Sequence, residues 1–167
     1  MSAPGDIRKA ENSRSDWRTP PELFALLDSE FHFTMDAAAS KKDALCPMYC
    51  TKEINALSPS ITMSPWSGVF CNPPYGNISE WVKAFIRWSE KAIVVALLPA
   101  ATDTRWFAEA ARTAKEIRLL SGRVSFIDPT GGGRTANTTG SCVVVWKPQE
   151  YPTYGIATWD WRKELSK

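Results

Sequence analysis

Three stretches of the chain place apolar side chains three and four positions apart, which is the period of an amphipathic helix. The first runs from residue 20 to about residue 30 and presents a leucine- and phenylalanine-rich face. Each helix has an expected capping residue. At the first helix, Thr19 forms a capping box with Glu22 and is followed by Pro20. Asn77 or Ser79 caps the second helix, and Thr102 or Thr104 caps the third. The apolar positions of the second and third helices are Trp81, Ala84, Phe85, Trp88, Trp106, Phe107, Ala110 and Ala111.

Uninterrupted apolar runs between polar or turn residues predict strands. Such runs are found at 33–35, in a second short stretch that ends at about residue 52, at 67–72 and at 92–98. The last of these has no polar position, which indicates burial on both faces, as in a parallel sheet. Two later runs, at 116–128 and 141–147, are joined by a glycine-rich loop and predict an antiparallel hairpin at the sheet edge.

Strands that alternate with helices and end in a hairpin indicate a three-layer α/β domain with a mostly parallel sheet. In such sheets ligands bind beyond the carboxyl ends of the strands, near the point where the strand order reverses. Asp36 and Asn72 both stand at the carboxyl ends of predicted strands. These two polar side chains are therefore the first candidates for a functional site.

Length and composition are typical of one domain with its own core. The chain has 167 residues, of which 44% are hydrophobic and 23% charged. We expect a flexible N-terminal arm at 1–16, one folded domain at 17–150 and a C-terminal tail at 151–167. The chain contains no run of about 18 apolar residues, so we expect no membrane span. Its polar N-terminus has no apolar signal segment. We therefore expect a cytoplasmic protein without a membrane partner.

The net charge and the cysteine content bear on whether a nucleic-acid partner or a metal site is expected. The net charge of +2 and the pI of 8.4 are compatible with a nucleic-acid partner but do not require one. Cys46, Cys50, Cys71 and Cys142 are scattered, and His32 is the single histidine. Zinc sites use paired ligands of these types, so we expect reduced, buried thiols and no metal.

The most distinctive stretch is FCNPPYG, which directly follows an apolar run. Two consecutive prolines give up two backbone donors and fix the backbone, which leaves a rigid ledge of carbonyl oxygens. Asn72 stands at one end of this ledge and Tyr75 at the other. A strand-ending turn without chemical function is the alternative interpretation, because Pro and Gly are common in turns.

Five segments, taken in order, resemble the small phage-type DNA N6-adenine methyltransferases, a Dam-like family. They are DWRTPPELF, MDAAAS, FCNPPYG, LLPAATDTRWF and GRVSFID with GSCVVVW, and together they span residues 16 to 147. The resemblance implies a Rossmann-like class I methyltransferase fold, with 17–150 as the catalytic domain. It also implies S-adenosylmethionine as methyl donor, S-adenosylhomocysteine as product, and DNA adenine as substrate inside a bacterial host cell.

By this resemblance, Asn72, Pro73, Pro74 and Tyr75 form the catalytic motif. The exocyclic amine of adenine is a poor nucleophile because its lone pair is delocalised into the ring. The Asn72 side-chain oxygen and the Pro73 carbonyl can accept its two N–H groups, which biases the nitrogen toward sp³ geometry and aligns it with the methyl group. The target base must leave the DNA stack. Tyr75 then offers it a flat face, and base–aromatic stacking is worth about 1–3 kcal/mol.

The resemblance also implies a cofactor site beside the motif. Asp36 would contact the methionine amino group, with Ala37 and Asn72 close to the cofactor. The DAAAS loop lacks the G-x-G of many cofactor-binding loops, so its alanines must permit the close approach usually given to glycine. The alternative for Asp36 is the N-cap of a helix that starts at AAASKK.

Two further segments complete the implied cofactor site. Trp17, Thr19 and Pro20 would lie near the methionine carboxylate. Glu53 or Asn55, after the second strand, could form hydrogen bonds with the ribose hydroxyls. A solvated surface carboxylate is the alternative interpretation of Glu53.

The DNA-facing surface is expected to consist of loops. Arg105, Arg123 and Arg134 fall in or near loops, and the polar TGGGRTANTTG segment can approach a phosphate backbone; a plain hairpin loop is equally compatible. Phosphate contacts give affinity without sequence choice. Base selection would then come from these loops, from the arm at 1–16 or from a second subunit.

Two rival functions share the NPPY motif. Amino-methyltransferases of RNA or of protein glutamine resemble the chain here, but they commonly carry a glycine-rich cofactor loop that DAAAS lacks. A catalytically silent DNA-binding module is the other rival, and the presence of Asp36, Asn72 and Tyr75 argues against it. Both a monomer and a homodimer are compatible with the sequence.

Overall fold

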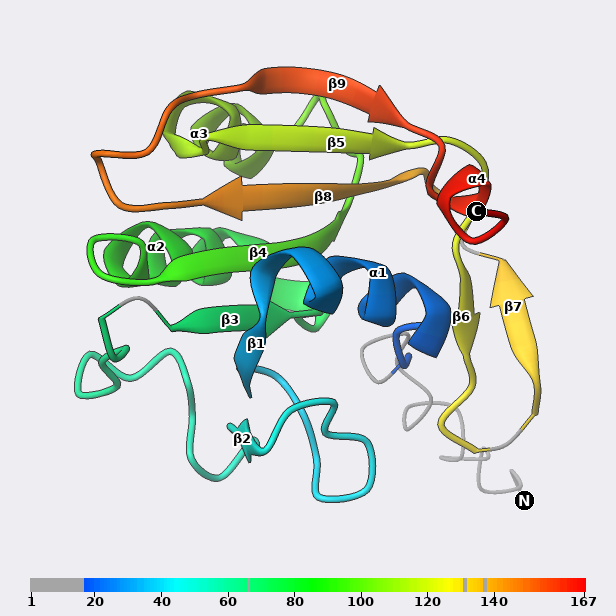
Figure 1. Cartoon of the computed structure of the whole chain (residues 1–167). Helices are drawn as coiled ribbons and strands as arrows, with labels where there is room; N and C mark the ends of the chain where they lie inside the picture. The colour runs from blue at the N-terminus through cyan, green and yellow to red at the C-terminus, as the bar shows by residue number, and fades with distance from the viewer. Residues whose placement is uncertain (1–16, 66, 131, 137) are drawn as a thin grey trace, which may run out of the picture.

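A computed structural model describes residues 17–65, 67–130, 132–136 and 138–167 (Figure 1). The predicted arm at 1–16 lies outside these ranges. The strands are β1 (Phe33–Asp36), β2 (Met48–Tyr49), β3 (Gly68–Cys71), β4 (Ile93–Pro99), β5 (Glu116–Leu120), β6 (Ser125–Ile127), β7 (Arg134–Ala136), β8 (Ser141–Trp146) and β9 (Gly155–Trp159). The helices are α1 (Pro21–Phe31), the short 3-10 helix η2 (Tyr75–Asn77), α2 (Ile78–Trp88), α3 (Arg105–Thr113) and α4 (Trp161–Glu164).

Seven strands form one sheet in the order β2-β1-β3-β4-β8-β5-β9, and β6 pairs with β7 in a separate hairpin. The sheet is mostly parallel, as predicted; only β8 runs antiparallel to its neighbours β4 and β5. The antiparallel pairing of β5 with β8 is therefore confirmed. Its predicted position at the sheet edge is wrong, because β8 lies inside the sheet and β9 forms the edge. All six residues of β8 are buried, in keeping with this interior position.

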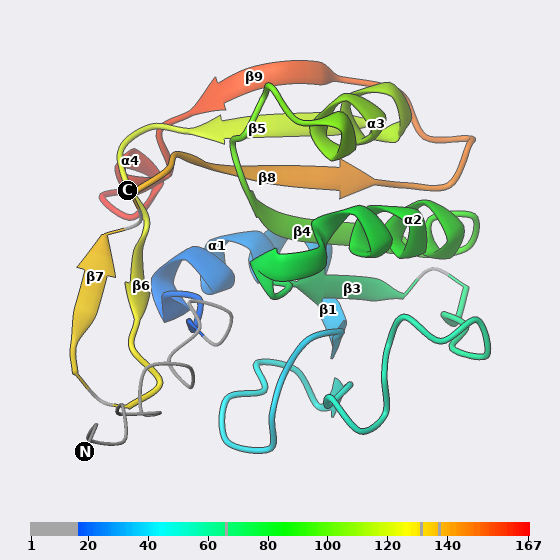
Figure 2. The same ribbon diagram turned by 180° about the vertical axis from the view of Figure 1, so that it is seen from behind.

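Helices cover both faces of the sheet, which confirms the three-layer α/β architecture. α1 lies on one face, and α2 and α3 lie on the other (Figures 1 and 2). Successive side chains of β4 alternate between two cores: Val94 and Ala96 pack on the α2–α3 side, and Val95 and Leu97 on the α1 side. This burial on both faces explains the unbroken apolar run in the sequence.

The start of α1 differs from the prediction. The helix begins at Pro21, and Pro20 is its N-cap residue. No side chain among the described residues caps this end, so the predicted capping box of Thr19 and Glu22 is wrong. Proline at the first helical position has no N–H that needs a partner. Glu22 instead forms an ion pair with Arg134 of β7.

The other helix starts are closer to expectation. At α3 the Thr104 hydroxyl accepts a 3.2 Å hydrogen bond from the Phe107 amide, which confirms one of the two predicted caps. Asn77 is the N-cap residue of α2, but its side chain forms no capping bond, because η2 leads directly into the helix. β2 is shorter than the predicted run and ends at Tyr49.

The C-terminal segment, expected to be a tail, takes part in the fold. β9 pairs with β5 from Gly155 to Trp159, and Trp161 of α4 is buried on the α1 side. The β6–β7 hairpin stands beyond the carboxyl ends of the parallel strands, next to the start of α1 (yellow in Figure 1). This hairpin therefore borders the edge at which ligands are expected.

Candidate active site at the carboxyl ends of the strands

The parallel strands bring Asp36 and Asn72 to the same edge of the sheet. Asp36, the last residue of β1, pairs with Phe70 in the neighbouring β3, so Asn72 follows two residues farther along. β4 runs parallel on the other side of β3 and ends at Pro99. The carboxyl ends of three adjacent parallel strands thus lie at the same edge, where α/β sheets bind ligands, and β4 continues past Ala96, its last pair with β3, to Pro99.

The NPPY turn is held rigidly at the end of β3. Pro73 is buried, whereas Asn72, Pro74 and Tyr75 are half-buried, so the turn has one face in the core and one open. Pro74 has a φ of −61°, and η2 starts at the next residue and continues into α2. A strand on one side, a helix on the other and two fixed proline rings leave this backbone little freedom.

The side-chain amide of Asn72 has a defined orientation. Its Nδ2 donates a 2.9 Å hydrogen bond to the backbone carbonyl oxygen of Trp17. A carbonyl can only accept, so the nitrogen must face Trp17 and Oδ1 must face away from it. The oxygen that the predicted chemistry needs is thereby kept as an acceptor.

The segment from Trp17 to Pro20, which we name the strap, is tied to distant parts of the chain. Arg18 exchanges two backbone hydrogen bonds of 3.0 Å with Ile127 of β6. Its guanidinium Nε lies 3.5 Å from Oδ2 of Asp43, in the loop after β1. The strap therefore links the β6–β7 hairpin, the loop after β1 and the NPPY turn.

Asp36 is buried and organises the loop that follows it. It is 3% exposed, and its two carboxylate oxygens accept hydrogen bonds from the amides of Ala38 (3.3 Å) and Leu45 (3.2 Å). Burial raises the pKa of Asp36, and these two donors oppose the shift. Turns rather than a helix follow at 37–47, so the helix N-cap interpretation of Asp36 is wrong.

The other residues expected around a cofactor lie in different surroundings. Ala37 is 1% exposed, and its amide donates to the Phe70 carbonyl at 2.9 Å. Glu53 and Asn55 are exposed in the turn after β2, and Asn55 adopts a φ of 48°, which asparagine tolerates better than most residues. A hydrogen bond from Thr51 lowers the pKa of Glu53, so its carboxylate is charged and open to solvent.

Tyr75 packs against the core on the α2–α3 side. Burial is the main cause that raises the pKa of its phenol, and nearby Cys142 adds to the shift. The phenol is therefore uncharged at neutral pH. Tyr75 is thus a neutral aromatic residue whose ring packs against this core.

The three arginines expected to face DNA do not share one environment. Arg105 is exposed at the first position of α3, shortly after the end of β4. Arg123 is exposed after β5, and its guanidinium lies close to Gly140: a Cβ added to that glycine would be 3.9 Å from Nη1. Arg134 is exposed on β7 but forms a two-bond ion pair with Glu22. Of these three arginines, Arg134 is the one that pairs with an acidic side chain among the described residues.

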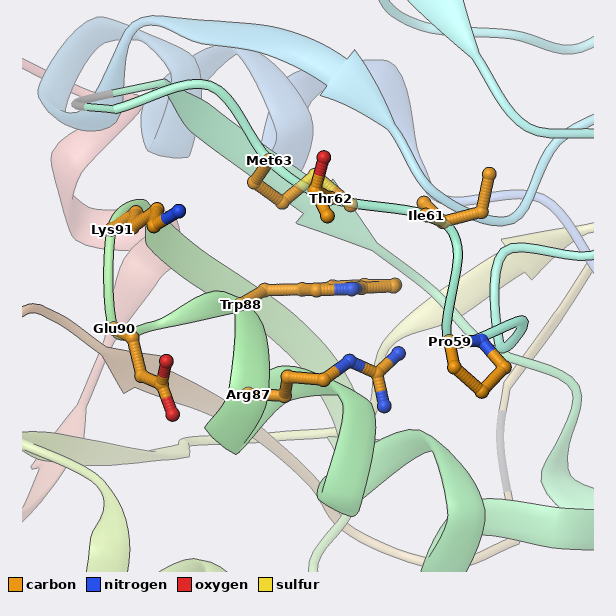
Figure 3. A pocket seen from close by; sticks show the side chains of 8 residues that line it. All are labelled: Pro59, Ile61, Thr62, Met63, Arg87, Trp88, Glu90 and Lys91. Atoms are coloured by element: carbon orange, nitrogen blue, oxygen red, sulfur yellow. The ribbon is translucent and has the colours of Figure 1, made fainter.

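A separate pocket lies at the opposite, amino-terminal edge of the parallel strands (Figure 3). It has a volume of about 100 Å³ and lies between the loop before β3 and the end of α2. The buried Nε1 of Trp88 has no hydrogen-bond partner within the described chain. The lining residues are Pro59, Ile61, Thr62, Met63, Arg87, Trp88, Glu90 and Lys91. None of them was predicted to belong to the site.

The described ranges also bear on metal and membrane binding. No group of three or more His, Cys, Asp or Glu residues there could hold a metal ion. No helix in this part of the chain is long and apolar enough to cross a membrane. All four cysteines are buried free thiols, as expected, and burial raises the pKa of Cys46 and Cys142 to about 12.

Sequence reasoning missed two residues of the strap contact, Arg18 and Asp43. Arg18 stands between Trp17 and Thr19, both predicted to lie near a carboxylate, so a cation in this segment was an available signal. Asp43 had no comparable signal, because it lies in a polar turn whose position depends on the fold.

A mostly parallel α/β sheet with helices on both faces, and with Asp36 and Asn72 at the carboxyl ends of its strands, is consistent with a Rossmann-like methyltransferase fold. The family model described as DNA N-6-adenine-methyltransferase (Dam) matches residues 7–167, and the chain belongs to this family. The resemblance inferred from the motifs is thus confirmed.

Two phage proteins named DNA N-6-adenine-methyltransferase are similar to the chain. The protein of Escherichia phage T1 is 31% identical over 156 residues, and that of Haemophilus phage HP1 is 30% identical over 154. The matches cover 80% and 86% of this chain, respectively. The matched part spans 63% of the T1 protein's length and 86% of the HP1 protein's length.

Proposed function

We propose that this protein transfers the methyl group of S-adenosylmethionine to the N6 amine of adenine in DNA. Membership in the Dam family and the names of the two phage relatives support this substrate. The observation that carries the mechanism is the 2.9 Å hydrogen bond from Asn72 Nδ2 to the Trp17 carbonyl. It leaves Asn72 Oδ1 as an acceptor at the edge where the strands end.

In this proposal Asn72 Oδ1 and the Pro73 carbonyl accept the two N–H groups of the adenine amine. The two acceptors favour the positive charge that develops on the nitrogen during transfer. They are held in place before substrate arrives, so little reorganisation is needed at the moment of reaction. Removing one such preorganised group from an enzyme typically costs about 10²–10³ in kcat.

Tyr75 binds the flipped base and Pro74 limits the space beside it. An uncharged ring suits this role, because stacking on a base needs a flat π-face and no proton transfer. Pro73 is buried, so water has little access to the ledge from the core side. Together these residues exclude water and orient the amine.

The chemistry of the side chains present suits S-adenosylmethionine, which when bound supplies an electrophilic methyl group on a sulfonium. Asp36 shapes the loop after β1 and places a carboxyl group near the cofactor's amino group, while Ala37 allows its close approach. Glu53 and Asn55 are open to solvent and can accept hydrogen bonds from ribose hydroxyls. The strap residues Trp17, Thr19 and Pro20 lie at the same edge, and Asn72 also borders the cofactor.

DNA phosphates would contact Arg105 and Arg123, with Arg134 contributing if DNA displaces its partner Glu22. Such contacts give affinity but no sequence choice. We place the reaction in the cytoplasm of a bacterial host, with the enzyme acting as a monomer or a homodimer.

A labelled-methyl assay with DNA, RNA and a glutamine-containing protein, run side by side, tests the substrate class. We expect label in DNA only, recovered as N6-methyladenine after digestion to nucleosides. Label in RNA or protein would support the rival amino-methyltransferases. Calorimetry should detect cofactor binding; no binding at high micromolar concentration would favour a silent DNA-binding module.

A further inference from the structure

Arg18 connects the strap to two other parts of the site. Its backbone forms both hydrogen bonds of the bridge to Ile127, and its side chain reaches Asp43. The residue directly before it, Trp17, supplies the carbonyl that orients Asn72. The position of that carbonyl therefore depends on how firmly Arg18 is held.

Asp43 is itself fixed within its turn. Its Oδ1 accepts hydrogen bonds from the Ser40 amide (2.5 Å) and the Ser40 hydroxyl (2.7 Å), which leaves Oδ2 for Arg18. Two residues later, the Leu45 amide donates to Asp36 at 3.2 Å. The loop that holds Arg18 is thus attached to the buried carboxyl group of the proposed cofactor side.

The pair differs from the exposed ion pairs of the same protein. The side chains of Arg18 and Asp43 are 34% and 21% exposed, whereas those of Lys83 and Glu80 on α2 are 59% and 49% exposed. The Nε of Arg18 is buried and has no hydrogen bond to a described residue, so Asp43 at 3.5 Å is the acidic group that faces it. Charges that are partly buried are screened less by solvent than exposed ones.

We propose that Arg18 and Asp43 are positioning residues: their ion pair holds the strap so that the Trp17 carbonyl keeps Asn72 Oδ1 facing the substrate amine. This inference rests on the proposed function. Without the pair the strap moves relative to the NPPY turn, and the carboxamide can rotate and exchange its oxygen and nitrogen. Substrate and cofactor still bind, but fewer bound complexes have the acceptor in place.

The test is a double-mutant cycle of Arg18→Ala and Asp43→Ala in the full chain, with DNA as substrate. We expect each single variant to lower kcat about tenfold, and the double variant to be no slower than either, because the residues act as a unit. KM for DNA should stay within about twofold of the parent value, and kcat is measured at saturating S-adenosylmethionine because other strap residues are proposed to border the cofactor. Lys83→Ala and Glu80→Ala are the matched controls, since they break an exposed pair of 2.8 Å and should leave kcat unchanged.

A second readout does not depend on activity. The side-chain NH₂ signals of Asn72 in ¹⁵N-labelled protein should be sharp in the parent and broadened or shifted in Arg18→Ala. Arg18→Gln keeps the aliphatic stem as far as Cδ and removes the guanidinium with its charge, so it carries the same expectations if the alanine variant is unstable.

The possible outcomes separate the two proposals. No methylation of DNA by the parent protein would overturn the proposed function and this inference with it. An active parent, together with variants of unchanged kcat and unchanged Asn72 signals, would overturn the positioning role alone. A loss of cofactor affinity with an unchanged kcat at saturating S-adenosylmethionine would also overturn it, because the pair would then serve cofactor binding and not the Asn72 acceptor.

Discussion

The two edges of the parallel strands differ in how their groups are held. At the carboxyl edge, Asn72, Trp17 and Arg18 are joined by contacts between segments far apart in the chain. At the amino edge a pocket is present between residues 59–63 and 87–91, and the Nε1 of Trp88 has no hydrogen-bond partner among the described residues. The oriented polar groups, rather than the pocket, are therefore the basis of the proposed site.

The largest difference between the edges is expected for Asn72→Ala. Loss of the oriented acceptor should lower kcat by about 10²–10³, because the substrate amine loses one of two preorganised partners. The calorimetric Kd for S-adenosylmethionine should remain near the parent value. Arg87→Ala, in the pocket at the other edge, is the matched control and should leave kcat unchanged; an equal loss there would remove the distinction between the edges.

Tyr75 should have the next largest effect. Tyr75→Ala removes the ring on which the flipped base would stack. It should lower kcat/KM for DNA about tenfold or more, in line with about 1–3 kcal/mol per stacked base. Tyr75→Phe keeps the ring and should stay close to the parent, because the raised pKa leaves the phenol uncharged. Steady-state kinetics with one DNA duplex measure both, and a phenylalanine variant as slow as the alanine variant would show that the hydroxyl matters.

Asp36 gives a smaller effect that depends on pH. Its pKa is raised by burial, so it takes up a proton at a higher pH than an ordinary aspartate, whose pKa is about 3.9. Cofactor affinity should therefore fall as the pH is lowered through this raised pKa, because a neutral carboxyl no longer pairs with an ammonium group. Calorimetry across the pH series should show this fall in the parent and a flat, weaker profile in Asp36→Asn. A parent profile that is equally flat would exclude Asp36 from the cofactor contact.

The smallest effect is expected at the amino edge. Trp88→Phe removes an indole N–H that has no described partner, so only packing is lost. Trp146→Phe is the comparison, since the Nε1 of Trp146 donates a 3.0 Å hydrogen bond to the Thr113 hydroxyl. Thermal melting should show a larger loss for Trp146→Phe, and Trp88→Phe should keep the parent kcat. A reduced kcat in Trp88→Phe would link the amino edge to the reaction.

Much of the fold was predictable because local periodicity reports burial. The unbroken run of β4 and the spacing of apolar residues in α2 indicate a buried parallel strand and an amphipathic helix. The place of β8 inside the sheet was not predictable, because strand order depends on packing between segments rather than on either strand alone. The same applies to β9, whose first four residues are exposed and carry no apolar alternation typical of a strand.

The candidate site divides in the same way. Asn72, Pro73 and Tyr75 belong to one local motif, and Asp36 was expected at the same edge because parallel strands end together. The contact between Asn72 and Trp17 joins residues 55 positions apart in the sequence, so no local sequence pattern predicts it. It is this contact that gives the carboxamide its direction.

The most direct test of that direction is the pH dependence of single-turnover methyl transfer by Asn72→Asp, measured relative to the parent. An ionised aspartate places an acceptor against the Trp17 carbonyl, whereas a protonated one can donate to it and leave its other oxygen for the adenine amine. We predict a variant that is slow at pH 8 and recovers relative to the parent as the pH is lowered. A variant that matches the parent rate at every pH would contradict the account.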